Sequence, residues 1–251
     1  MDQSTTEALL AVAAEAARKA GSILSEVYRT APGVRGTEGK DIKTEADVAA
    51  EQAIRQILGP TGLPILGEEE GWSGETSGDG PCWVVDPLDG TFNFVRGLPF
   101  CGVSLALWQG GEPILGTIYD LTDGSLLEGI CGGEARCDGQ IVEVSSVTSN
   151  AQAVLATGFP NQRDYRPEAL QKSIRGFQQF KKIRMLGSAA LALAQVVRGR
   201  IDAYWEEDIW WWDVAAGLAL VRAAGGAYTM LPGTRPGQFH VFAHNGHLRL
   251  D

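Results

Sequence analysis

The apolar residues near the start of the chain recur with helical spacing. Apolar positions three and four residues apart predict an amphipathic helix over residues 4–28 and a second helix over 47–58. Thr44 and Asp47 have the spacing of a helix N-terminal cap. Residues 31–40, between the two helices, contain glycine and are expected to form a loop. The chain therefore opens with a pair of helices.

Further along the chain, shorter apolar runs predict strands. In the middle of the chain, turn sequences such as Gln109-Gly110-Gly111 separate these runs as in hairpins, and in the second half the strands alternate with helices. A meander followed by such alternation predicts a mixed α and β fold with two sheets and helices packed on them. The strands are expected over residues 101–108, 113–120, 125–131, 141–144, 153–157, 182–185, 201–205, 227–230 and 241–243, and the later helices over 167–180, 188–197 and 213–224.

Acidic residues gather next to three apolar segments. Trp83-Val84-Val85 predicts a buried strand that delivers Asp86 and Asp89 where regular structure breaks. The acidic run 68–70 follows another short apolar segment, and Asp213 opens an apolar helical pattern. Carboxylates at a strand end are costly to bury unless they face a cation, and hard cations prefer clustered oxygen ligands. The three segments together therefore indicate a metal site, although three glutamates alone are more often a solvated loop.

The charge of the chain supports a bound cation. Its 251 residues carry a net charge of −10, so nucleic acid, which needs a basic surface, is not expected as a partner. Glu68, Asp86, Asp89 and Asp213 together carry −4 when ionised. Two divalent ions would neutralise this charge and three would reverse it. Such a site repels a phosphate ester without metal and attracts it when metal is bound.

The composition also bears on the cellular compartment. No apolar run approaches the ~18 residues of a membrane span, and the N-terminus is acidic where a signal peptide would be basic. The four cysteines lack the paired spacing of a metal finger and are expected to be reduced thiols, mostly buried as small hydrophobes. We therefore expect a cytoplasmic protein without a membrane partner.

Three motifs, in this order along the chain, resemble those of the inositol monophosphatase family of magnesium-dependent, lithium-sensitive sugar phosphatases. The resemblance implies a layered αβαβα sandwich with a boundary near residue 145, so that lobes 1–145 and 146–251 together form the active site. It also implies a homodimer that hydrolyses a small phosphate monoester with two or three Mg²⁺ ions. The motifs are Gly67-Glu68-Glu69, Asp86-Pro87-Leu88-Asp89-Gly90-Thr91-Phe92-Asn93-Phe94 and Trp212-Asp213-Val214-Ala215-Ala216-Gly217.

The resemblance implies catalytic and metal-binding roles. Glu68 and Thr91 are expected to orient the attacking water, while one ion lowers the pKa of that water and another stabilises the leaving alkoxide. Asp47 is expected near Thr91 and a weaker third ion, with a plain helix cap as the alternative. Asp213 can cap a helix and bind metal at once. The expected metal ligands are Glu68, Asp86, the backbone carbonyl of Leu88, Asp89 and Asp213.

The expected substrate contacts come from the same resemblance. Gly90 and Thr91 would offer N–H groups at the start of a helical turn, which favours anions. Glu206 matches a position that binds a sugar hydroxyl, and Lys40 matches a basic residue near the phosphate, with a flexible surface lysine as the alternative. The full set is Asp89, Gly90, Thr91, Gly187, Ser188, Ala189, Glu206 and Asp213, and for residues 187–189 an ordinary helix cap is the alternative.

Trp210 and Trp211 depart from the family pattern, because many relatives carry smaller or polar residues there. Two indoles could stack on a sugar or aromatic group, shrink the pocket, or pack in a dimer interface. The substrate therefore stays open among inositol monophosphate, histidinol phosphate, fructose bisphosphate and phosphoadenosine nucleotides. Phe92-Asn93-Phe94 has the inositol-phosphatase form rather than the form of the nucleotide phosphatases.

Two other functions compete with this interpretation. A haloacid-dehalogenase-type phosphatase needs two aspartates at positions i and i+2, whereas Asp86 and Asp89 stand at i and i+3, which excludes it. A regulatory or scaffold protein with the same fold stays open. The intact metal ligands argue against a pure pseudoenzyme, but they do not exclude a second role.

Overall fold

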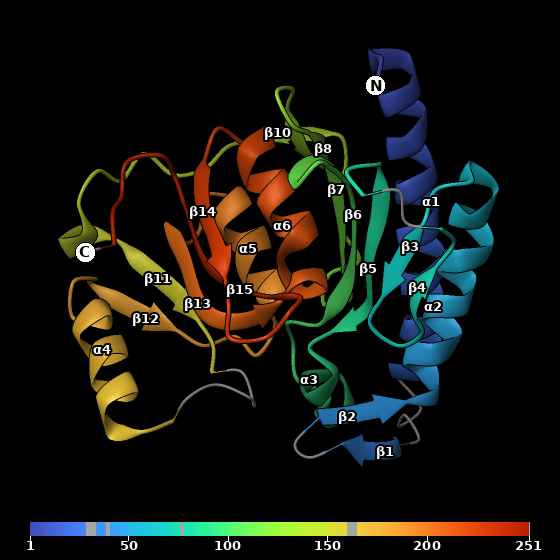
Figure 1. The fold of residues 1–251 in the computed structure, drawn as a ribbon. Helices are drawn as coiled ribbons and strands as arrows, with labels where there is room; N and C mark the ends of the chain where they lie inside the picture. Colours follow the sequence, from blue (N-terminus) through green and yellow to red (C-terminus); the bar gives the residue numbers. More distant parts are fainter. Residues whose placement is uncertain (29–33, 39–40, 76–77, 160–164, 251) are drawn as a thin grey trace.

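A computed structural model describes residues 1–28, 34–38, 41–75, 78–159 and 165–250. Two helices, an eight-stranded sheet, two more helices, a five-stranded sheet and a final helix lie side by side as five layers (Figure 1). The predicted mixed α and β fold and its αβαβα layering are confirmed. The helices are α1 (Gln3–Tyr28), α2 (Glu45–Leu58), the short α3 (Thr91–Arg96), α4 (Pro167–Phe177), α5 (Ala189–Val197) and α6 (Trp211–Ala223), with 3₁₀ turns at Gly59–Thr61 and Asn150–Gln152.

The eight-stranded sheet comes from the first half of the chain. Its strands run in the order β10-β9-β8-β7-β6-β5-β3-β4, and the β3–β5 pair is the one parallel pair in this sheet. Helices α1 and α2 cover its outer face, where leucine, isoleucine and valine side chains form a continuous core with both helices. The bounds are β3 (Ile65–Gly67), β4 (Gly71–Ser73), β5 (Cys82–Asp89), β6 (Gly102–Gln109), β7 (Glu112–Asp120), β8 (Leu126–Ile130), β9 (Ala135–Cys137) and β10 (Gln140–Val142).

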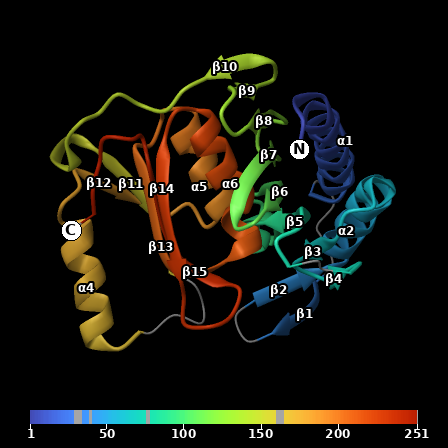
Figure 2. The ribbon, with the colours of Figure 1, turned by 45° about the horizontal axis from the view of Figure 1, so that its top comes forward.

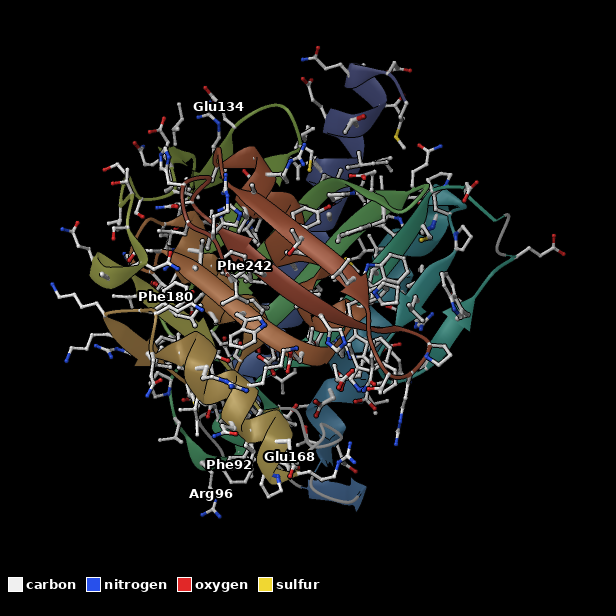
Figure 3. All side chains as sticks on the ribbon, turned by 60° about the vertical axis from the view of Figure 1, so that its left-hand side comes forward. Phe92, Arg96, Glu134, Glu168, Phe180 and Phe242 are labelled. Atoms are coloured by element: carbon white, nitrogen blue, oxygen red, sulfur yellow. The ribbon has the colours of Figure 1, made fainter. Side chains whose placement is uncertain are left out.

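The five-stranded sheet comes from the second half of the chain. Its order is β12-β11-β13-β15-β14, with β11 parallel to both of its neighbours. Helix α4 covers part of the outer face, over a small core that includes Phe180 and Phe242 (Figure 3). The bounds are β11 (Val154–Thr157), β12 (Lys182–Arg184), β13 (Ala203–Trp210), β14 (Ala227–Pro232) and β15 (Gln238–His244).

Helices α5 and α6 fill the space between the two sheets (Figure 2). All nine residues of α5 are buried, and α6 is buried from Val214 to Val221. A helix that is apolar on every side is stable where it is covered on every side, and the two sheets supply that cover. Small residues permit the close approach of the two helices. A Cβ atom at Gly217 would lie 2.4 Å from Leu193 Cδ1.

Most of the predicted elements are present, and the differences have local causes. Part of the predicted loop 31–40 is a strand, because β1 (Val34–Glu38) pairs with β2 (Asp41–Thr44) as an antiparallel hairpin. Strand β13 is five residues longer than predicted at its end, since an irregular register carries it past residue 205 to Trp210. As a result Asp213 is the third residue of α6 rather than its first. The short strands β4 and β9 carry too few apolar residues to be predicted.

Two further expectations concern the chain as a whole. None of the described helices combines the length and the apolar character needed to cross a lipid bilayer. The four cysteines are free thiols, of which Cys101 is buried and the others are half-buried. The division into lobes 1–145 and 146–251 stays a proposal. The two sheets come from separate halves of the chain, but the core between them contains residues of both halves.

The α5–α6 contact generates a prediction about stability. Gly217→Ala should lower the free energy of unfolding by about 1–3 kcal/mol, because its new methyl group overlaps Leu193 in a packed core. The control is Ser22→Ala on the exposed side of α1, where the substitution changes no core contact. We expect no loss of stability from this control, and urea unfolding measures both variants. Equal stability of the two variants would contradict the proposed close packing.

Candidate active site

The acidic cluster begins where two parallel strands end together. Gly67 of β3 pairs with Val85 of β5, so the next residue of each strand leaves the sheet at the same place. The N–H of Glu68 donates to the carbonyl of Val85 at 3.2 Å, and the carboxyl groups of Glu68 and Asp86 share a hydrogen bond. Asp86 is buried, and its Oδ1 accepts the N–H of Leu88 at 2.9 Å. Parallel pairing thus brings the first two motifs together.

Asp89 joins this cluster from the end of β5 and ties it to α5. Its Oδ2 accepts the hydroxyl of Ser188 at 2.5 Å and the N–H of Ala190 at 2.6 Å. The Ser188 hydroxyl also accepts the N–H of Leu191, so it caps α5. The helix-cap alternative for Ser188 is therefore correct, and the cap brings Ser188 into contact with the predicted metal ligand Asp89.

Asp213 approaches the cluster from α6. Its carboxyl interacts electrostatically with those of Asp89, Glu68 and Glu206, and it accepts the N–H of Trp210 at 3.3 Å. The residue therefore holds the start of α6 and faces the other acids, as the sequence led us to expect. Asp86 and Asp89 are buried, whereas Glu68 and Asp213 are half-buried. The cluster is thus partly accessible to solvent.

The protonation of these acids reflects their crowding. Burial raises the pKa of Glu68 to about 8 and that of Asp89 to about 6. Burial, followed by repulsion from neighbouring carboxylates, holds the pKa of Asp86 and of Asp213 well above the usual range. Within the described residues, no lysine, arginine or histidine forms an ion pair with any of the four. Ionised carboxylates gathered in this way need a cation from outside the chain.

The donor chemistry of the cluster suits magnesium. Every predicted ligand offers oxygen, the preferred donor of this ion. Within the described part of the chain, no three His, Cys, Asp or Glu side chains are arranged to hold one ion together. Mg²⁺ needs fewer, because it keeps several waters and binds through one or two carboxylates plus substrate oxygens. The oxygen donors of this cluster are therefore compatible with magnesium.

Thr91 and Asp47 meet next to this cluster. The Thr91 hydroxyl lies 3.0 Å from the carbonyl of Leu88 and 3.3 Å from Asp47 Oδ1. The other oxygen of Asp47 accepts the N–H and the hydroxyl of Thr44, which completes the capping box of α2. Burial raises the pKa of Asp47. Asp47 therefore takes part in the cap of α2 and also contacts Thr91, while its role at a third ion stays a prediction.

Gly90 makes the turn between β5 and α3. Its φ is +84°, and a Cβ atom there would lie 2.7 Å from the carbonyl oxygen of Phe100. Only glycine suits this conformation at such a close approach. The turn directs the N-terminus of α3 toward the acidic cluster, and Thr91 is the first residue of that helix. On the far side of α3, Phe92 is exposed and Arg96 lies over its ring at 5.3 Å (Figure 3).

Two supporting residues were missed at the level of sequence. Asn93 donates to the carbonyls of Phe100 and Leu186, at 2.9 and 2.8 Å, and so holds α3 against the segment that precedes α5. Glu51 is fully buried in α2 and accepts the N–H groups of Glu69 and Glu70, at 2.8 and 3.2 Å. An acidic residue on the apolar face of a predicted helix was the available signal for Glu51.

Glu206 and the tryptophans lie on the C-terminal side of the site. Glu206 is buried, and its Oε2 accepts the hydroxyl of Tyr204 at 2.7 Å. Trp211 of α6 packs edge-on against Trp108 of the eight-stranded sheet, with ring centroids 5.5 Å apart. Trp210 and Trp212 stack on each other at 4.9 Å. Trp211 is therefore part of the packing between the sheets, whereas Trp210 is half-buried at the start of α6.

The remaining predicted residues lie as follows. Gly187 has a φ of +77° beside the side chain of Asn93, and Ala189 is the first residue of α5, so the two flank Ser188, which contacts Asp89. Glu70 is exposed and pairs with Arg55, as expected for a surface acid. Lys40 lies outside the described residues.

Comparison with known proteins agrees with this arrangement. The chain is 35% identical to the Nus factor SuhB of Pasteurella multocida over 96% of its own length and 90% of that protein. It resembles the structure of inositol monophosphatase from Anabaena (Nostoc) sp. PCC 7120 with a TM-score of 0.83 and 32% identity, covering 96% of this chain and 92% of that one. It also resembles inositol monophosphate-bound SaIMPase-II, with a TM-score of 0.79 and 25% identity, covering 96% and 90%.

The family model for inositol monophosphatases matches residues 5–249. This match includes every residue of the acidic cluster described above. The chain therefore belongs to the inositol monophosphatase family and is a phosphatase, a phosphoric monoester hydrolase.

Proposed function

We propose that this protein hydrolyses a small phosphate monoester in a magnesium-dependent reaction with direct attack by water. The observation that carries the proposal is the cluster of Glu68, Asp86, Asp89 and Asp213, which has no ion-pair partner among the described residues. Magnesium bound there would neutralise the charge of the phosphate and activate the water. Two divalent ions would neutralise the charge of the four ionised acids, and three would leave the site positive.

The chain's own residues would position the reactants. Thr91 has two acceptors, Asp47 and the Leu88 carbonyl, within reach of its hydroxyl, so its O–H points toward them and its lone pairs can accept a hydrogen bond from water. Glu68 lies at the half-buried side of the cluster, where it would hold the attacking water. The N–H groups of Gly90 and Thr91 at the start of α3 would bind the phosphate oxygens.

An inositol monophosphate is the substrate that we propose. One structural relative binds this compound. Glu206 supports the assignment, because a buried carboxylate beside the acidic cluster can accept hydrogen bonds from ring hydroxyls. Histidinol phosphate, fructose bisphosphate and phosphoadenosine nucleotides remain the alternatives. A phosphate-release assay over this panel would identify the substrate by the highest kcat/KM.

A second, regulatory function has one observation in its favour. A close relative carries the name Nus factor rather than the name of a phosphatase. Such a role would persist in a variant that has lost catalysis. The substitution Asp89→Asn, described next, would therefore separate the two functions. We also propose a cytoplasmic homodimer that is inhibited by lithium. Light scattering and lithium titration would test its mass and its inhibition.

Asp89→Asn should fold and lose most of its activity. The substitution preserves size and one acceptor for the α5 cap but removes a negative charge that would bind metal and lie beside the substrate. We expect kcat to fall at least ~100-fold, the scale for a group that acts on transition-state charge. The matched control is Asp138→Asn, an exposed carboxylate whose loss should leave kcat unchanged. A folded Asp89→Asn protein with more than half of the wild-type rate would rule out the assignment.

Removal of metal should abolish activity and should also make the stability of the folded protein fall as pH rises. Raised pKa values mean that the folded, metal-free protein retains protons that the unfolded chain has released. Its free energy of unfolding should therefore fall as pH rises from about 5 to about 8. Tm should drop by about 3 °C per pH unit, and excess chelator should abolish phosphate release.

The measurement is thermal unfolding at pH 5.5 and pH 8, with chelator or with magnesium. Magnesium should raise Tm more at pH 8, where the acids are ionised. Glu68→Gln, which cannot titrate at this position, should show a smaller dependence on pH. A metal-free Tm that stays constant or rises over this range would contradict the prediction.

Trp210 and Trp211 should respond differently to truncation. Trp211→Ala removes packing between the two sheets and should cost about 3 kcal/mol of stability without reordering the substrates. Trp210→Ala should reorder a panel of sugar, inositol and aromatic phosphates through KM by roughly 2- to 13-fold, the value of one stacked ring. Steady-state kinetics and Tm of both variants decide between the roles. An unchanged ranking in Trp210→Ala would end the selectivity hypothesis.

A further inference from the structure

Asp208 has an unusual backbone conformation close to the site. Its φ is +60°, in the left-handed region that glycine adopts freely and that, among other residues, asparagine and aspartate tolerate best. The residue is buried, although its neighbours Glu207 and Trp210 are only half-buried. A buried charged residue in a strained conformation persists only where its surroundings hold it.

The strain accompanies a bulge in β13. Glu206 pairs with Val241 of β15 and Ile209 pairs with Phe239, so Glu207 and Asp208 together oppose a single residue. Such a bulge interrupts the alternation of side chains. Without it, Ile209 would face the side opposite to Glu206. With it, Ile209 joins the core between the sheets and Glu206 faces Asp213 on the same side.

Glu207, the first residue of this bulge, points to the face of β13 opposite to Glu206. Its carboxylate faces α4, where Lys172 Nζ lies 3.0 Å away on the outer face of the five-stranded sheet. Two adjacent glutamates thus point to opposite faces of β13, one toward the acidic cluster and one away from it. The bulge that follows them determines how Glu206 and the start of α6 can face the same site.

A turn between β14 and β15 holds the bulge in place. Asp208 Oδ1 accepts the N–H of Thr234 at 2.8 Å and also its hydroxyl, while the N–H of Asp208 donates to His240 Nδ1 at 3.3 Å. A Cβ atom at Gly233 would lie 2.9 Å from the same carboxylate oxygen, so the turn lies directly against it. Three hydrogen bonds thus fix Asp208 from its own backbone and from its side chain.

The same turn also holds the chain beyond the bulge. The N–H of Trp211 donates to the carbonyl of Gly237 at 3.0 Å, and the turn itself is closed by a 2.8 Å bond from Gly233 N–H to the carbonyl of Gln238. Asp208 and Trp211 are therefore anchored on either side of residues 209–210. The turn between β14 and β15 thus braces the segment from Glu206 to Asp213 at two points.

We propose that Asp208 is a positioning residue whose contact with Thr234 fixes the β13 bulge and thereby aims Glu206 at the substrate. The inference rests on the proposed function, because it gives Glu206 a substrate hydroxyl to bind. Asp208 itself touches no reacting group. Its effect should therefore reach catalysis only through the place of the Glu206 carboxylate.

Kinetics with two substrates test this proposal. Inositol 1-phosphate offers ring hydroxyls to Glu206, whereas p-nitrophenyl phosphate offers none. Asp208→Ala should raise KM for inositol 1-phosphate about 10-fold, the value of one hydrogen bond to a charged group, and leave KM for p-nitrophenyl phosphate unchanged. Asp208→Asn should keep the wild-type ratio of the two KM values, since asparagine tolerates the same φ and keeps an acceptor for Thr234.

Three further variants complete the design. Thr234→Val, which keeps the shape and loses the hydroxyl, should shift the ratio in the same direction by about 3-fold. Glu206→Gln should reproduce the pattern of Asp208→Ala. Glu207→Gln is the matched control next to the bulge and should leave both KM values unchanged. A merely structural role would lower Tm in Asp208→Ala and leave the substrate ratio at its wild-type value, which would overturn the proposal.

Crystal structures of the wild type and of Asp208→Ala give a readout that does not depend on activity. We expect the Glu206 carboxylate to leave its hydrogen bond to the Tyr204 hydroxyl in the variant. A Glu206 carboxylate that keeps this bond would overturn the positioning role. A wild type that hydrolyses neither substrate, or a Glu206→Gln variant with an unchanged ratio, would instead refute the proposed function, and the crystal structures would still decide the role of Asp208.

Discussion

The structure has to hold four carboxylates close together, although burial and mutual repulsion oppose their ionisation. Glu68, Asp86, Asp89 and Asp213 come from three separate segments, and the folded chain raises the pKa of each. Folding alone therefore works against this cluster, and a bound cation relieves the repulsion. The two sheets, the helices between them and the supporting hydrogen bonds provide the stability that keeps these acids together.

Each layer contributes one part of that arrangement. The parallel β3–β5 pair brings the first two motifs to a common edge, and the start of α5 donates two hydrogen bonds to one oxygen of Asp89. Helix α6, buried between the sheets, presents Asp213 from the other half of the chain. The hydrogen bonds of Asn93 hold α3 in place, and a hydrogen bond to Glu51 holds the loop at Glu69. The arrangement of the proposed metal ligands thus depends on packing as much as on the ligands themselves.

The sequence predicted the parts of this fold that have strong periodicity or a specific motif. Apolar spacing placed α1, α2 and most strands of both sheets, and the motifs brought Glu68, Asp86, Asp89 and Asp213 into one site. It could not place β1 and β2, because Val34–Glu38 has no apolar alternation. It also missed Glu51 and the bulge at Asp208, since both are determined by residues far away in the chain, such as Glu69 and Thr234.

We propose that the acidic cluster is a magnesium site whose carboxylates are partly protonated without metal. Isothermal titration of Mg²⁺ near pH 7, repeated in buffers of different ionisation enthalpy, measures both the affinity and the protons released. The account predicts saturable binding with net release of protons from the wild type, and much weaker binding to Asp86→Asn. Saturable binding without proton release, or equal binding to the two proteins, would contradict it.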